Sequence, residues 1–191
     1  MANFYEAFKI TMKYEGGYAN DPDDIGGETY KGIARKYNPN WKGWSIIDSY
    51  KDFTNFPKCL NEDIKLQDLV ISLYKQKYWD PYLGDVLDQI IANEMFDTAV
   101  NIGVYRAIKF LQKGLNLLNR NGKLYSDIIE DGDFGPKTLN AYNNLPKPDL
   151  NILYNIMNIL QGMHYIEYMT KSPIQEKFAR GWFKRIDIRK T

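Results

Sequence analysis

Residues 14–33 of the chain have the sequence YEGGYANDPDDIGGETYKGI. Between Glu15 and Thr29 this segment holds three aspartates, one proline and four glycines, and few side chains that could pack a core. Asparagine and aspartate side chains cap backbone amides in turns, and a Gly-Gly pair favours a tight turn. The segment therefore predicts a polar loop with a small β-hairpin near residues 21–30.

The residues before this loop predict an amphipathic helix over residues 3–14, because Phe4, Phe8 and Met12 recur at helical spacing. Glu15 lies on the same apolar stripe, and the glycines that follow it favour the end of a helix. Burial and the negative end of the helix dipole both favour the neutral form of a carboxyl group. Glu15 is thus a candidate general acid. The alternatives are a solvated surface glutamate or a calcium loop, although the loop lacks the EF-hand spacing.

The loop also carries a long signature, Glu15-Gly-Gly-Tyr-x-Asn-Asp-Pro-x-Asp-x-Gly-Gly-x-Thr-x-x-Gly-Ile33. It resembles the signature of glycoside hydrolase family 108, a family of lysozyme-like N-acetylmuramidases that are often phage-derived and sometimes labelled secretion activators. It is also similar to the phage-type lysozyme pattern, in which eight residues separate a Glu from an Asp or Cys, and five more precede a Thr. Asp24 has this separation from Glu15, whereas Thr29 comes one residue early.

The resemblance implies a mainly α-helical, lysozyme-like fold and hydrolysis of the β-1,4 bond between N-acetylmuramic acid and N-acetylglucosamine. In this interpretation Glu15 protonates the leaving oxygen, Asp24 is the second catalytic carboxylate, and Thr29 holds the attacking water. Carboxyl groups roughly 5–5.5 Å apart would predict retention of configuration, and roughly 6.5–9.5 Å inversion. Other candidates for the second carboxylate are Asp97, Asp21 and Glu28.

Two other functions remain open at this point. A lytic transglycosylase would close a 1,6-anhydro ring and needs only one carboxyl group. A non-catalytic cell-wall-binding or secretion-accessory protein would need none, and the intact motif at Glu15 speaks against it.

Residues 87–102 form the most apolar predicted helix, our candidate for the helix through the middle of the fold. Glu94, Asp97 and Asn101 form one polar edge along it, which either lines the substrate cleft or satisfies polar groups inside the protein. We assign to substrate binding the residues Tyr18, Asn20, Asp21, Tyr30, Asp97 and Asn101.

The second half of the chain contains RAIKFLQKGLN at residues 106–116 and DGDFGPKTL at residues 131–139. Together they resemble the small helical peptidoglycan-binding modules. The physical content of the second motif is structural, since Asp131-Gly132 predicts a turn and Pro136 the first turn of a helix. The resemblances imply a catalytic region at residues 1–95 and a peptidoglycan-binding-like region at residues 96–191. The latter either binds the wall or completes the fold, in a core of its own or a shared one.

Four further features have structural interpretations. Trp79 is predicted to fill a core, and His164 to be packed or solvated rather than catalytic. Arg185 belongs to a Gly-Trp-x-x-Arg segment that resembles the family's ending, and it could pair with an acid in the core. Residues 33–37 predict a short helix.

Composition narrows the functional classes. The 191 residues carry 25 Lys and Arg against 24 Asp and Glu, which argues against a nucleic-acid-binding protein. A single cysteine excludes an internal disulfide, and with a single histidine a zinc site is not expected. We expect no metal and no cofactor, a monomer, and peptidoglycan glycan strands as the partner.

The sequence also bears on localisation. It lacks a run of about 20 apolar residues, so no membrane span is expected. The N-terminus lacks the profile of a secretory signal, so the expectation is synthesis in the bacterial cytoplasm, followed by export or holin-type release to the wall.

Overall fold

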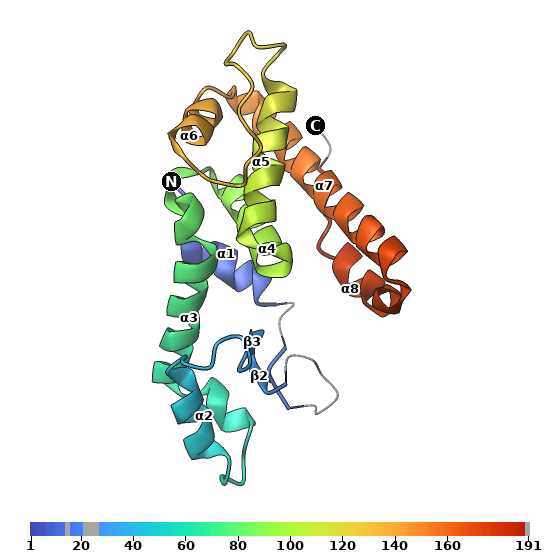
Figure 1. Cartoon of the computed structure of the whole chain (residues 1–191). Coiled ribbons are helices and arrows are strands. Elements are labelled where there is room, and N and C mark those ends of the chain that lie inside the picture. The colour runs from blue at the N-terminus through green and yellow to red at the C-terminus, as the bar shows by residue number, and fades with distance from the viewer. Residues whose placement is uncertain (14–15, 21–26, 190–191) are drawn as a thin grey trace. The chain divides into compact units, whose positions relative to one another are not determined.

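The computed structural model describes residues 1–13, 16–20 and 27–189 of the chain. This part forms eight α-helices, several short 3-10 helices and one three-stranded antiparallel sheet (Figure 1). The mainly α-helical, lysozyme-like fold is thereby confirmed. The chain divides into a smaller unit, Phe8–Lys77, and a larger unit that combines Met1–Ala7 with Tyr78–Thr191. No helix in the described ranges is both long enough and apolar enough to cross a membrane.

The predicted β-hairpin is present in the smaller unit. Its two strands, β1 (Tyr18–Ala19) and β2 (Thr29–Tyr30), flank residues 20–28. A third strand, β3 (Ile33–Ala34), pairs with β2 and completes the sheet. Tyr18 pairs with Tyr30 in the first antiparallel ladder. Residues 21–26 lie outside the described part, so the structure describes the base of the hairpin.

The turn between β2 and β3 corrects one prediction. Lys31 and Gly32 have positive φ angles of 46° and 75°. Two such residues in succession are typical of a type I′ turn, which joins the strands of a two-residue hairpin because its twist matches theirs. Ile33 therefore enters a strand opposite Tyr30. The short helix predicted for residues 33–37 is wrong because the Lys-Gly pair directs the chain back along β2.

Helices and one 3-10 turn support this sheet. The smaller unit continues with α2 (Gly43–Tyr50), η1 (Lys58–Asn61) and α3 (Ile64–Tyr78). At the start of α3, Asp63 Oδ1 accepts a hydrogen bond of 2.7 Å from the Leu66 N–H, which satisfies one of the free amides of the first turn. Tyr74 Oη donates to the Lys31 carbonyl at 2.7 Å, so α3 holds the β2–β3 turn in place.

The first helix is shorter than predicted. The sequence favours a helix over residues 3–14, and α1 spans Phe4–Thr11, after which residues 12 and 13 form a turn.

The larger unit is a helical assembly around α4 (Gln89–Ile102). In Figure 1, α4 lies beside α5 (Val104–Leu118) and α7 (Leu150–Lys171), and the three helices pack on one another. The remaining elements are η2 (Asp80–Tyr82), η3 (Gly84–Val86), α6 (Pro136–Asn143), η4 (Lys147–Asp149), η5 (Pro173–Phe178) and α8 (Ala179–Phe183). Ile91, Met95 and Ala99 on α4 are fully buried, as a helix through the middle of a core requires.

Trp79 fills this core, as predicted. Its ring is fully buried and contacts the edges of Phe4 and Phe96 at centroid distances of 5.5 and 6.1 Å. The indole N–H donates to Asp85 Oδ1 at 3.0 Å, so the polar atom of this buried ring is satisfied. A Cβ at Gly84 would overlap the indole, and the absence of a side chain there makes room for the ring.

The Asp131-Gly132 turn and the helix at Pro136 also appear as predicted. Gln112 of α5 holds the turn, since its Nε2 donates to Asp131 Oδ1 at 2.8 Å and its Oε1 accepts from the Gly132 N–H at 2.9 Å. Pro136 occupies the first turn of α6. One buried glutamine thus joins α5 to the loop that leads into α6.

Candidate active site

The residues at the centre of the proposed chemistry fall in the signature loop. Glu15, Asp24 and Asp21 lie outside the described residues, and their assignments stay predictions. The structure does describe the segments on either side, from Gly16 to Asn20 and from Gly27 onward.

Thr29 and Tyr18 lie at the base of this loop. Both are half-buried, whereas Asn20 is exposed. Thr29 Oγ1 donates to the Gly27 carbonyl at 3.1 Å. A hydroxyl group that donates its hydrogen still has lone pairs, so Thr29 can accept a hydrogen bond from a water molecule.

Glu28, an alternative for the second carboxylate, anchors this part of the sheet. Its carboxylate accepts from Arg35 Nη1 at 2.7 Å, Lys51 Nζ at 2.8 Å and Tyr18 Oη at 2.9 Å, and its side chain is 12% exposed. Burial by itself raises the pKa of Glu28, but the hydrogen bonds from Lys51, Arg35 and Tyr18 outweigh it and hold the pKa below its ordinary value. Glu28 thus has the ionised state that a second carboxylate needs, but its oxygens are already occupied by three protein donors.

Tyr30 is directed into the interior. It is 1% exposed, its hydroxyl donates to the Leu60 carbonyl at 3.2 Å, and it accepts from Gln67 Nε2 at 2.9 Å. In this structure its side chain therefore joins the sheet to η1 and α3.

In the polar edge of α4, Glu94 and Asp97 make internal contacts, and Asn101 lines a pocket. Asp97 Oδ1 accepts from Arg185 Nη1 at 2.7 Å, with side chains 13% and 8% exposed, which confirms that Arg185 pairs with an acid in the core. Asn101 Nδ2 donates to the Asp97 carbonyl at 3.0 Å. This ion pair ties α4 to the segment after α8. Removing either partner would leave an uncompensated buried charge.

Glu94 lies deeper in the same edge. It is buried, and Thr98 Oγ1 donates to its Oε1 at 3.0 Å. Burial, and then the negative charge of Asp97, raise the pKa of Glu94 to about 8. With a pKa raised in this way the carboxyl group favours the protonated form that an acid catalyst needs, but it lies in the core.

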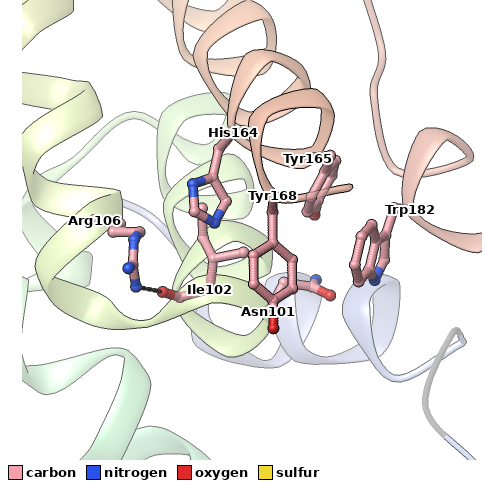
Figure 2. A pocket seen from close by; sticks show the side chains of 7 residues that line it. All are labelled: Asn101, Ile102, Arg106, His164, Tyr165, Tyr168 and Trp182. Atoms are coloured by element: carbon pink, nitrogen blue, oxygen red, sulfur yellow. Dashed lines mark hydrogen bonds between the residues drawn. The ribbon is translucent and has the colours of Figure 1, made fainter. Parts of the chain in front are cut away.

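The larger unit contains a pocket of about 340 Å³ formed by α4, α5, α7 and α8. Figure 2 shows Arg106 at one end and Trp182 at the other, with aromatic side chains between them. The lining residues are Asn101, Ile102, Arg106, His164, Tyr165, Tyr168 and Trp182. Asn101, which the sequence assigned to substrate binding, is one of them.

No group of three or more His, Cys, Asp and Glu side chains in the described ranges is placed to hold a metal ion.

Comparison with known families bears on both halves of the chain. The sequence model described as glycosyl hydrolase 108 matches residues 8–103 of the 191. The chain belongs to the glycosyl hydrolase 108 family. The match spans the whole signature and continues to the end of α4, so Glu15, Asp24, Thr29 and Asp97 all lie within the family 108 region.

A second model, described as a predicted peptidoglycan domain, matches residues 106–187. Together the two matches support a glycoside hydrolase that acts on peptidoglycan, and peptidoglycan as its partner.

Among solved structures, the chain is similar to Brucella abortus SagA, with a TM-score of 0.60 and 24% sequence identity over 96% of this chain and 88% of that one. This chain and the SagA structure therefore share their fold over nearly the whole length of the chain. No curated protein matches the sequence.

Apart from Asn101, the residues that line the pocket of this family 108 protein were not predicted from sequence to form a site. His164 and Tyr168 stand four residues apart on α7, a spacing that places two side chains on one helix face, and this was the available signal. Arg106 and Trp182 come from α5 and α8, and only the packing of these helices brings them to the pocket.

Proposed function

We propose that this family 108 protein is an N-acetylmuramidase that cleaves the β-1,4 bond between N-acetylmuramic acid and N-acetylglucosamine. The observation that carries the proposal is the family match over residues 8–103, which includes the complete signature from Glu15 to Ile33. The peptidoglycan-domain match supplies the class of substrate.

In the proposed reaction, Glu15 donates a proton to the glycosidic oxygen as the C1–O bond breaks, and the leaving sugar departs with a free hydroxyl group. Asp24 stabilises the oxocarbenium-like transition state or acts as base toward water. The water oxygen bonds to C1, and its proton leaves through a carboxylate. Thr29 supports the position of this water, and its hydroxyl geometry is compatible with that role.

The other assignments follow from this reaction. We propose that Tyr18, Asn20 and Asp21 contact the glycan near the signature loop. Tyr30 and Asp97 keep their assignment to the site as proposals, and their observed contacts suit them to support neighbouring residues. Residues 1–95 would carry the chemistry and residues 96–191 would hold the wall.

The test is the Glu15→Gln variant, which preserves the shape of the side chain and removes the titrating proton. Loss of a general acid costs about 10²–10⁴-fold in rate, so we expect purified cell walls to lose turbidity with wild type and not with this variant. Glu6→Gln is the matched control, because Glu6 is an exposed carboxylate on α1. Equal lysis by wild type and Glu15→Gln would overturn the role of Glu15. Sedimentation of both proteins with walls, and lysis by neither, would instead identify a binding protein.

The second carboxylate needs its own measurement. We expect Asp24→Asn to be strongly impaired, and ¹H NMR of the first-formed anomer of the wild-type product to distinguish retention from inversion. Full activity of Asp24→Asn would exclude Asp24 and redirect attention to Asp21 and Asp97.

A further inference from the structure

The pocket of the larger unit combines aromatic surfaces with one cation. Tyr168 is 44% exposed and stacks in parallel on His164 at a centroid distance of 6.3 Å. Trp182 packs against Tyr165 at 5.2 Å and an interplanar angle of 18°, and lies 5.9 Å from Tyr168. These rings lie side by side along the pocket and give it a largely apolar wall, as in most ligand sites.

Arg106 supplies the charge. Its guanidinium donates to the Ile102 carbonyl at 3.1 Å, which orients it at the end of the pocket (Figure 2). Among the described residues it has no carboxylate partner. A guanidinium group has donors left over after one such bond, and their planar arrangement matches a carboxylate.

The remaining polar groups suit an uncharged part of a ligand. Burial lowers the pKa of His164, and the charges of Arg106 and Lys171 lower it further, against the opposing effect of Glu167. A neutral imidazole offers one donor and one acceptor. Asn101 adds an amide to the lining of the pocket. Flat apolar rings, neutral hydrogen-bonding groups and one guanidinium group together fit an N-acetylated sugar that bears a carboxylate.

We propose that this pocket binds a carboxylate attached to an N-acetylmuramyl ring, with Arg106 as the carboxylate partner and Tyr168 and Trp182 as the surface for the ring. The ligand class rests on the proposed action on peptidoglycan, and the pocket itself does not depend on Glu15. The carboxylate has two sources, the lactyl group of muramic acid or the peptide attached to it.

The experiment titrates the ¹⁵N-labelled full chain with single sugars that it cannot cleave, and follows the indole N–H of Trp182 by NMR. The probes are N-acetylmuramic acid, N-acetylmuramyl-L-alanyl-D-isoglutamine with its free γ-carboxyl group, and N-acetylglucosamine as the neutral sugar. We expect at least one acidic probe to bind about tenfold more tightly than N-acetylglucosamine, a difference typical of one charge-assisted contact. Binding of the first acidic probe identifies the lactyl carboxylate, and binding of the second alone identifies the peptide carboxyl group.

Variants then locate the site. Arg106→Gln should abolish the preference for the acidic probe, Tyr168→Ala should weaken all binding, and Arg180→Gln, which removes an exposed cation of α8 outside the pocket, should behave as wild type. Thermal denaturation checks that each variant folds. Equal affinity for acidic and neutral sugars in wild type, or an unchanged preference in Arg106→Gln, would overturn the proposal. If wild type and Glu15→Gln lysed walls equally while the pocket still preferred the acidic sugars through Arg106, only the muramidase proposal would be overturned.

Discussion

At the scale of single residues, Glu28 and Glu94 are two carboxyl groups with opposite environments. Glu28 faces two cations and a tyrosine hydroxyl, and its pKa lies below the ordinary value of 4.5. Glu94 lies in the core beside another acid, and its pKa is raised to about 8. Folding therefore favours the charged form of the first residue and the neutral form of the second.

Glu28→Gln should destabilise the smaller unit. Asp48 also pairs with Arg35 and Lys51 at 2.6 and 2.7 Å, so the substitution unbalances a network of two acids and two bases. Hydrogen bonds to charged groups contribute about 1.5–3 kcal/mol each, and we expect the free energy of unfolding to fall by about 1–3 kcal/mol because the network is partly exposed. Urea denaturation at pH 7 measures this loss.

The pH dependence of the same variant gives the control. Because the pKa of Glu28 is depressed by folding, its stabilisation is present above pH 4.5 and is lost as the pH falls through its pKa in the folded protein. The difference between wild type and Glu28→Gln should therefore shrink on acidification. A difference that stays constant down to acid pH would contradict the account of this carboxylate.

Glu94→Gln should show the opposite pH dependence to Glu28→Gln, because wild type loses the stability due to Glu94 as the pH rises. The folded protein keeps a proton on Glu94 that the unfolded chain loses above its ordinary pKa of 4.5, so wild type loses stability as the pH rises from that value to about 8. The steepest slope for one group is about 1.4 kcal/mol per pH unit. Thermal unfolding between pH 5 and 8 should show the stability of Glu94→Gln rising relative to that of wild type. If the stabilities of the two proteins changed in parallel with pH, Glu94 would not be neutral in the folded protein.

At the scale of elements, the turn that connects the α5 region to α6 depends on the absence of a side chain at Gly132. Its φ is +75°, and a Cβ there would overlap the ring of Tyr105. Gly122 has almost the same φ, +76°, with open space around it. The pair separates the effect of backbone conformation from that of steric overlap.

Gly132→Ala should therefore destabilise the protein more than Gly122→Ala does. A left-handed conformation costs an alanine about 1–2 kcal/mol. The overlap of the new methyl group with the exposed Tyr105 ring adds to this loss, toward the lower end of the roughly 1–3 kcal/mol typical of overpacking. The midpoints of urea denaturation of the two variants give the comparison. Equal losses would mean that Tyr105 moves aside freely.

Local patterns predicted many of the elements. Helical periodicity placed the apolar helix that became α4, and Pro136 placed the start of α6. The hairpin followed from its turn residues. The β3 strand was missed because Lys31 adopts a positive φ that a lysine rarely takes, and its identity gives no sign of this. The end of α1 at Thr11 was also missed, since the periodic pattern continues beyond it.

At the scale of the whole molecule, the functional assignment came from motifs, and the pocket came from packing. The signature around Glu15 and the Asp131–Leu139 motif indicate both families without knowledge of the fold. Residues that line one pocket only through long-range packing, such as Arg106 and Trp182, share no local pattern. From sequence, Arg185 could pair with an acid of the core, and the structure identifies that acid as Asp97. The boundary between the regions 1–95 and 96–191 stays a prediction.

The two regions would divide the work of one enzyme. The family 108 region would bring Glu15 to the glycosidic bond, and the pocket of the larger unit would hold an acidic part of the same polymer. Binding to a polymer at two linked sites raises the effective concentration of the second contact. Such an arrangement would keep the enzyme on the wall between cleavage events.

The most direct measurement is mass spectrometry of the products released from purified peptidoglycan, after borohydride reduction. Hydrolysis at the proposed bond predicts fragments that end in reduced N-acetylmuramic acid with wild type, and none above background with Glu15→Gln. Fragments that end in a 1,6-anhydro ring would identify a transglycosylase, and fragments that end in reduced N-acetylglucosamine would show cleavage of the other glycosidic bond. Either result would contradict the central claim.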